Sequence, residues 1–155
     1  MAARTSKDVV LSSSLLIDDQ MCFALYAASR SLTAVYRPLL EPLGLTYPQY
    51  LVMLVLWQQE SCRIKDIAAT LHLDYGTLTP LLKRLEALGL LTRQRRVDDE
   101  RAVEVALTTQ GAALRKQAAH IPVEISKALG LTATQVADLR ELLRLISDNT
   151  AAYST

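Results

Sequence analysis

Apolar residues recur at intervals of three and four along most of this chain, which is the spacing of amphipathic helices. Residues 18–37 show the pattern first, and Asp18 and Asp19 mark the start of a helix. Because Pro38 follows, this long helix is predicted to end at about Arg37. Its stripe consists of Cys22, Leu25, Tyr26, Ser29, Leu32, Thr33 and Tyr36.

Two shorter helices follow after a break at 42–44. Thr46 can cap a helix over 47–59, and Ser61 can cap another over 63–71. The first of these is hydrophobic through its middle, which predicts a buried helix. The second is amphipathic, with Ile64, Ile67, Ala68 and Leu71 predicted to face inward.

A tight turn at 73–77 leads into a further helix over 77–87. We expect Pro80 in its first turn, where the missing N–H is tolerated, and Gly89 as a left-handed stop. Its predicted buried stripe is Leu78, Leu81, Leu82, Leu85 and Leu88.

The period then changes to two. Residues 90–95 and 102–107 alternate between apolar and polar, and the charged segment 96–101 joins them, which predicts a two-stranded hairpin. Helical spacing returns at Thr108 or Thr109 and is interrupted at Pro122. After Gly130, a last helix from Thr132 is predicted to turn inward Val136, Leu139, Leu142, Leu143 and Ile146.

The 155 residues suit one domain, and half of them are hydrophobic. Two cysteines, Cys22 and Cys62, are too few for a disulfide framework. The longest stretch without charge, 42–59, is continuously apolar only over 51–57, so we expect no membrane span. No signal peptide is recognisable, and the cytoplasm is the expected compartment.

The net charge is only +1, but basic residues gather in one segment. Two short helices joined by a tight turn and followed by a hairpin form the outline of a winged helix-turn-helix, mainly α with a small β-hairpin wing. The second helix of such a motif enters the major groove of DNA. Residues 83–96 carry Lys83, Arg84, Arg93, Arg95 and Arg96 against the single acid Glu86.

Position along the motif predicts a role for each polar side chain. Thr77 and Thr79 lie at the end that meets base edges, whereas Lys83 and Arg84 suit phosphates. One copy would contact too little DNA for specific binding, so we expect a homodimer. Its operator would be double-stranded and pseudo-palindromic, with half-sites about ten base pairs apart. The hairpin supplies Arg93, Arg95, Arg96 and Arg101, and Tyr75, Gly76 and Asp99 complete the predicted DNA-binding set.

The run LDYGTLTPLLKRLE at 73–86, with Asp99-Glu100-Arg101 in the hairpin tip, resembles the MarR family of transcriptional regulators. More closely, it resembles the organic-hydroperoxide-sensing OhrR branch, and segments 19–26 and 45–50 agree. The resemblance spans about residues 16–150. It implies a MarR-like dimer in one domain, with a flexible tail at 1–17, dimerisation helices at 18–45 and 108–151, and a DNA-binding lobe at 46–107.

The resemblance also implies a redox sensor. Cys22 matches the peroxide-sensing cysteine of the branch, and Tyr36 and Tyr47 match two tyrosines that hydrogen-bond it. Cys22 and Tyr36 are 14 residues apart on one predicted helix, so about 21 Å separates them along its axis. They therefore meet only if Tyr36 comes from the other subunit, with two long helices packed antiparallel.

The implied mechanism is oxidation of the Cys22 thiolate to sulfenic acid, followed by repacking of the dimer and release of the operator. Many members of the branch carry a resolving cysteine near 125–130, where this chain has none. A low-molecular-weight thiol is therefore expected to cap oxidised Cys22, and Cys62 is interpreted as structural. Tyr75 stands where the branch commonly has a small residue, which indicates a different operator preference.

Other functions remain open at this point. A repressor of the same class could be released by a small aromatic or lipophilic ligand in a cleft between the dimerisation helices and the lobe, with Cys22 structural. An interaction module without DNA binding would lack steep salt dependence. An enzyme is not expected, because no Cys-x-x-Cys or Ser–His–Asp grouping occurs and His72 and His120 are isolated. Neither a cofactor nor a metal is predicted, since no paired ligand spacing occurs.

Overall fold

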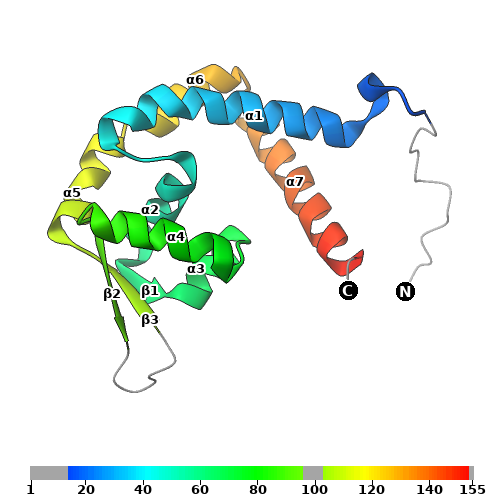
Figure 1. Cartoon of the computed structure of the whole chain (residues 1–155). Helices are drawn as coiled ribbons and strands as arrows, with labels where there is room; N and C mark the ends of the chain where they lie inside the picture. Colours follow the sequence, from blue (N-terminus) through cyan, green and yellow to red (C-terminus); the bar gives the residue numbers. More distant parts are fainter. Residues whose placement is uncertain (1–13, 96–102, 154–155) are drawn as a thin grey trace.

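The computed structural model describes residues 14–95 and 103–153 of the chain. This part is mainly helical with a small antiparallel sheet, as the sequence predicts (Figure 1). In chain order the elements are η1 (Ile17–Asp19), α1 (Met21–Leu40), η2 (Glu41–Leu43), α2 (Tyr47–Gln59), β1 (Ser61–Arg63), α3 (Ile64–Leu71), α4 (Tyr75–Ala87), β2 (Leu91–Arg95), β3 (Val103–Leu107), α5 (Thr109–Ala118), α6 (Ile121–Leu129) and α7 (Ala133–Tyr153).

Helix α1 differs from its prediction at both ends. Asp18 and Asp19 lie in η1, and α1 begins after Gln20. At the other end α1 continues through Pro38 to Leu40. A proline so close to the end removes one intrahelical bond of the last turn. Leu40 is 1% exposed, and its burial holds that turn against the core.

Helix α2 is the centre of the predicted winged-helix lobe and has its predicted bounds. Thr46 and Gln49 form a capping box, in which Gln49 Oε1 accepts a hydrogen bond from the Thr46 backbone N at 2.8 Å. Its apolar side chains point in all directions and pack against α1, α3, α4, α5 and the sheet. The buried residues of α2 are Gln49, Tyr50, Val52, Met53, Val55, Leu56 and Trp57.

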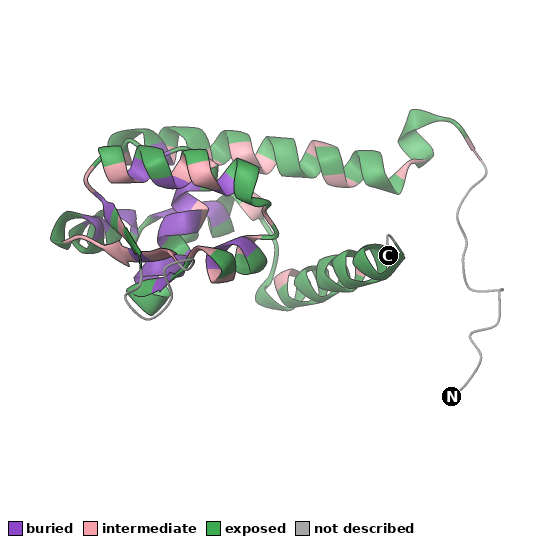
Figure 2. Ribbon diagram, turned by 60° about the horizontal axis from the view of Figure 1, so that its bottom comes forward, coloured by how far each residue is buried: buried purple, intermediate pink, exposed green. Residues whose placement is uncertain are grey.

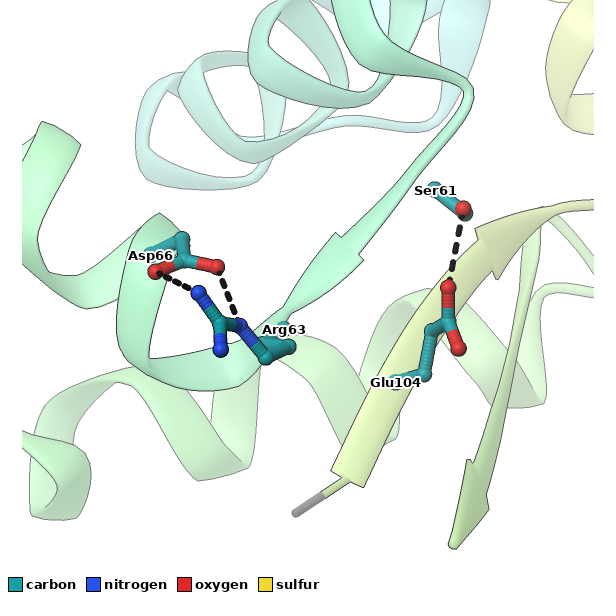
Figure 3. Close-up of polar contacts among 4 residues, drawn as sticks. All are labelled: Ser61, Arg63, Asp66 and Glu104. Carbon is teal, nitrogen blue, oxygen red and sulfur yellow. Dashed lines mark hydrogen bonds and ion pairs between the residues drawn. The ribbon is translucent and has the colours of Figure 1, made fainter. Parts of the chain in front are cut away.

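The sheet has three strands rather than the predicted two, in the order β1-β3-β2. Ser61 does not cap a helix. It pairs with Ala106 of β3, and its Oγ donates a hydrogen bond to Glu104 Oε1 at 3.0 Å (Figure 3). Three residues are too few to display a period of two, so the sequence contains no signal for β1. Arg63 ends this strand and forms an ion pair with Asp66 of α3 at 2.8 Å.

Helix α4 begins at Tyr75, two residues earlier than predicted, because Asp74 caps it. Pro80 therefore lies in the second turn of α4 and not in the first. Leu78, Leu82 and Leu85 are fully buried, as predicted. Leu88 is 45% exposed instead, since α4 ends at Ala87 and Gly89, with φ +72°, turns the chain toward β2.

A close backbone approach joins α5 to the start of β2. A Cβ at Gly111 would lie 1.9 Å from the carbonyl oxygen of Leu90, so only glycine fits there. Trp57 Nε1 donates a buried hydrogen bond of 2.8 Å to the Gly111 carbonyl oxygen. Thr108 caps α5 as predicted, with its Oγ1 accepting from the Gly111 backbone N. This junction fixes the base of the wing against α2.

Helix α7 contradicts the predicted inward face. The helix is interrupted next to Pro122, the second residue of α6, and Gly130 ends α6, both as expected, but α7 then leaves the body of the domain (Figures 1 and 2). No described residue of α7 is buried, and Leu139, Leu142 and Leu143 are 42%, 58% and 38% exposed. The periodicity is real, but no other described element of this chain covers the apolar stripe.

Within the described ranges, no single helix is long and apolar enough to cross a membrane. The pair Met21–Leu43 and Tyr47–Gln59 passes the same test of length and composition when taken together, although it is bent by 69°. The second helix of this pair is the buried core helix α2.

Candidate functional site

The helix-turn-helix consists of α3, a turn at 72–74 and α4. His72 adopts a left-handed conformation with φ +52°, which ends α3 and redirects the chain. Leucines of α4 face α2, and the opposite side of α4 is open. Lys83 and Arg84 lie exposed there, and Tyr75 is exposed at the first residue of α4, so all three are accessible to a partner.

The first turn of α4 is held by its cap. Asp74 Oδ1 accepts from the Thr77 backbone N at 2.8 Å, and Asp74 Oδ2 accepts from Thr77 Oγ1 at 2.9 Å. These bonds lower the pKa of Asp74. A Cβ at Gly76 would lie 3.0 Å from Asp74 Oδ1, which favours glycine beside the cap. The Thr77 hydroxyl proton is thus engaged, and its oxygen keeps acceptor capacity.

Two further side chains lie near this end of α4. Tyr75 is 58% exposed, whereas Thr79 is half-buried. Apolar and aromatic groups contact the thymine methyl group in the major groove. The ring of Tyr75 is therefore more accessible for such a contact than the methyl group of Thr79.

The described strands of the wing contain two of the predicted arginines, Arg93 and Arg95, and only Arg93 is paired with an acidic side chain in the described residues. Arg95 is exposed at the end of β2. Arg93 is grouped by sequence with the DNA-contacting arginines, but the structure pairs it with Glu86 of α4, with Nη2 to Oε2 at 2.6 Å. The predicted contacts Arg96, Asp99 and Arg101 lie outside the described residues.

The predicted sensor residues occupy two separate places. Cys22 is the second residue of α1 and is exposed. Tyr36 lies 14 residues further along the same helix, about 21 Å away along the axis. Tyr47 begins α2, and its ring lies 4.5 Å from that of Tyr36 between centroids. One chain therefore brings the two tyrosines together and keeps Cys22 apart, as the helical spacing predicts.

The aromatic cluster is larger than predicted. The ring of Tyr50 lies 5.9 Å from Tyr36 and 6.0 Å from Trp57. Burial, with Tyr47 and Tyr50 nearby, raises the pKa of Tyr36 to about 12, and burial also raises the pKa of Tyr47. Their hydroxyls therefore stay protonated near neutral pH and can donate hydrogen bonds. Tyr50 lies three residues after Tyr47 on the predicted helix, and this spacing could have identified it as a neighbour of Tyr47.

The two thiols have contrasting environments. Cys62 is 8% exposed in β1, opposite Val105. Burial raises the pKa of Cys62, and Asp66 and Glu104 raise it further. A buried thiol with a raised pKa is poor in thiolate and reacts slowly with oxidants. This agrees with a structural role for Cys62 and leaves Cys22 as the accessible thiol.

Comparison with known proteins identifies the class. The sequence family described as transcriptional regulator SarA/Rot matches residues 34–117. The organic hydroperoxide resistance transcriptional regulator of Bacillus subtilis (strain 168) is 48% identical over 126 residues, which are 81% of this chain and 84% of that protein. The chain belongs to the SarA/Rot and MarR-type family of winged-helix DNA-binding transcriptional regulators.

Solved structures agree with this assignment. The structure of reduced AbfR bound to DNA, a protein of Staphylococcus epidermidis, matches with a TM-score of 0.78 at 30% identity, over 90% of this chain and 95% of that one. A cysteine-to-serine mutant of MarR from E. coli matches with a TM-score of 0.64 at 28% identity, over 82% and 96%. These relatives are transcriptional regulators and not enzymes.

Proposed function

We propose that two copies of this chain form a repressor that binds a pseudo-palindromic operator and releases it when organic hydroperoxide oxidises Cys22. The observation that carries this proposal is the separation along α1. An exposed thiol lies at one end of a continuous helix, and a pair of protonated phenols lies at the other. Antiparallel packing of two α1 helices places each thiol beside the other copy's phenols.

The apolar surface that the chain leaves uncovered supports dimerisation. Near Cys22 in the sequence, Leu15, Leu16 and Phe23 are 99%, 69% and 41% exposed. Exposed leucines also line α7. Contiguous exposed apolar surface on a soluble domain marks an interaction site. We therefore assign 18–45 and 108–151 to the dimer and 46–107 to DNA binding, as the sequence predicts.

The chemistry at Cys22 is a two-electron oxidation. The thiolate sulfur attacks the terminal peroxide oxygen, the O–O bond breaks, and the sulfur becomes sulfenic acid while an alcohol leaves after taking up a proton. A low-molecular-weight thiol then condenses with the sulfenic acid to give a mixed disulfide and water. In the reduced dimer, Tyr36 and Tyr47 of the partner subunit donate hydrogen bonds that favour the thiolate.

Oxidation changes the size and hydrogen bonding of one group in the interface between the α1 helices. The two recognition helices must fit half-sites of fixed spacing, so a small rotation of one copy against the other is enough to weaken binding. The DNA-bound structure of reduced AbfR and the hydroperoxide-resistance role of the Bacillus relative support this interpretation.

A ligand-released repressor is the second candidate, and a hollow beside Tyr47 favours it. The hollow has a volume of about 580 Å³ and lies where α1, η2 and α2 meet. This size suits a small molecule. Thr33 and Arg37 contribute polar groups, and Leu40 and Leu45 contribute apolar walls.

A gel-shift experiment tests the proposal. The DNA upstream of this chain's own gene is mixed with reduced protein, with cumene hydroperoxide, and with cumene hydroperoxide plus a small thiol. We expect release by peroxide in the wild type and in Cys62→Ser, and retention in Cys22→Ser. Release that persists in Cys22→Ser would refute thiol sensing. Binding that ignores peroxide would favour the ligand-released repressor instead.

A further inference from the structure

A side-chain pair, Glu86 and Arg93, ties the recognition helix to the wing. Glu86 lies in the last turn of α4, and Arg93 is the middle residue of β2. Glu86 Oε2 accepts from Arg93 Nη2 at 2.6 Å and from Arg93 Nε at 2.9 Å, while Oε1 accepts from the Arg93 backbone N at 3.1 Å. We call this pair the Glu86–Arg93 clamp.

The clamp is part of the lobe's packing and not a loose surface contact. The Arg93 and Glu86 side chains are 25% and 35% exposed, and their hydrogen bonds lower the pKa of Glu86. Two charge-assisted bonds from one guanidinium fix both the distance and the orientation of the partners. The third bond fixes the backbone of β2 itself, so the helix holds the strand as well as the side chain.

The position of the clamp links two groups that are predicted to contact phosphates. Arg95 follows Arg93 by two residues, so it lies on the same face of β2 and about 7 Å further toward the tip. Lys83 precedes Glu86 by three residues and therefore shares its side of α4. Any tilt between α4 and β2 changes the distance between Lys83 and Arg95.

We propose that Glu86 and Arg93 are positioning residues for operator binding. They bind each other and not DNA, and they hold α4 and β2 at the angle at which Lys83 and Arg95 reach one duplex together. The inference rests on the proposed DNA roles of Lys83 and Arg95. It gives Arg93 a different role from the other arginines of the hairpin.

Neutralising Glu86 tests the clamp, because the clamp and simple charge repulsion predict opposite changes in affinity for DNA. Removing a carboxylate near DNA strengthens binding on charge grounds alone, because phosphate repulsion falls. The clamp predicts the opposite: Glu86→Gln weakens binding of the upstream duplex about tenfold. Glu60→Gln, which neutralises an exposed carboxylate of the same lobe, serves as the matched control and does not weaken binding. Unchanged or tighter binding by Glu86→Gln would overturn the proposal.

Salt dependence separates positioning from direct contact. Arg93→Gln is expected to weaken binding about tenfold at every salt concentration, with the slope of log K against log salt unchanged. The slope stays the same because Lys83 and Arg95 still reach their phosphates in the complex, and only the free-energy cost of aligning α4 with β2 is added. Lys83→Ala, as the phosphate-contact control, removes one phosphate contact from each copy of the dimer and lowers the magnitude of that slope by about 2. An equal drop in slope for Arg93→Gln would make Arg93 a phosphate contact and refute the clamp. An unchanged slope for Lys83→Ala would instead refute the proposed role of Lys83.

A double-mutant cycle completes the test. Since the two residues act as one unit, the double variant Glu86→Gln/Arg93→Gln should bind no more weakly than either single variant. If the fold-loss of affinity in the double variant equals the product of the two single fold-losses, the residues act independently, which would count against the clamp. Circular dichroism and urea unfolding of each variant confirm that the lobe is folded under the binding conditions.

Discussion

Leucine side chains are buried in the winged-helix lobe and exposed on the C-terminal helix. In α4, Leu78, Leu82 and Leu85 are 0% exposed, because α2 and the sheet strand β2 pack against α4 within the same chain. In α7, Leu142 has a similar helical spacing but is 58% exposed. The ribbon of α7 is coloured as exposed along nearly all its length (Figure 2). The core of the lobe is complete in one copy, whereas the apolar stripe of α7 has no cover within the described part of the chain. In the proposed function, DNA binding therefore needs the packing of one copy, and sensing needs the packing of two.

The largest expected effect comes from a charge in the uncovered stripe. Leu139→Arg places an unpaired guanidinium at the centre of the α7 stripe, which should cost dimerisation about 3–5 kcal/mol. In sedimentation velocity, the wild type should run at twice the 17.1 kDa chain mass and the variant at one. Leu54→Arg, at an exposed leucine of α2, is the control and should stay dimeric. A dimeric Leu139→Arg would place the interface elsewhere.

The next effect is a difference in the free energy of unfolding that is lost when a leucine is truncated in each region. Leu82→Ala removes a fully buried side chain of the lobe and should lower the free energy of unfolding by about 2–5 kcal/mol in urea denaturation. Leu142→Ala, measured in the monomeric Leu139→Arg background, should change it by less than about 0.5 kcal/mol. Comparable losses would mean that α7 is already packed in the monomer.

A smaller effect concerns the junction at the base of the wing. Trp57→Phe keeps an aromatic ring but loses the 2.8 Å bond to Gly111, which should cost about 1 kcal/mol of unfolding free energy. Tyr26→Phe removes an exposed hydroxyl that accepts from Arg30 and should be neutral within about 0.5 kcal/mol. If Trp57→Phe is also neutral, the wing does not depend on this bond for its attachment to α2.

The smallest effect is spectroscopic. Folded Tyr36 keeps its proton to about pH 12, whereas an unfolded tyrosine loses it near pH 10. The folded state therefore binds more protons in this window, and stability falls as the pH rises through it. Tyrosinate absorbance at 295 nm should show a late component that Tyr36→Phe reduces; the buried Tyr47 and Tyr50, whose pKa values are also raised, contribute the rest. A titration curve that lacks this component in the wild type would contradict the burial of the cluster.

Much of the lobe could be predicted because its signals are local. The bounds of α2 follow from the Thr46 cap and the apolar run, and the end of α6 follows from Gly130. The start of α4 was misplaced because Asp74, and not a later residue, supplies the cap. Strand β1 was missed because its pairing with β3 is a long-range contact. The role of Arg93 depended on Glu86, which lies on another element and is brought beside Arg93 only by the packing of α4 against β2.

Residue spacing alone was enough to predict that the helices and the two hairpin strands exist, and to predict the distance between Cys22 and Tyr36 along α1. Each of these depends on local periodicity and on the fixed rise of a helix or strand. Packing between elements settled which periodic stripes are covered, which thiol is accessible and which arginine of β2 is already paired. These outcomes require knowing what lies opposite each side chain, and no pattern within a single element contains that information.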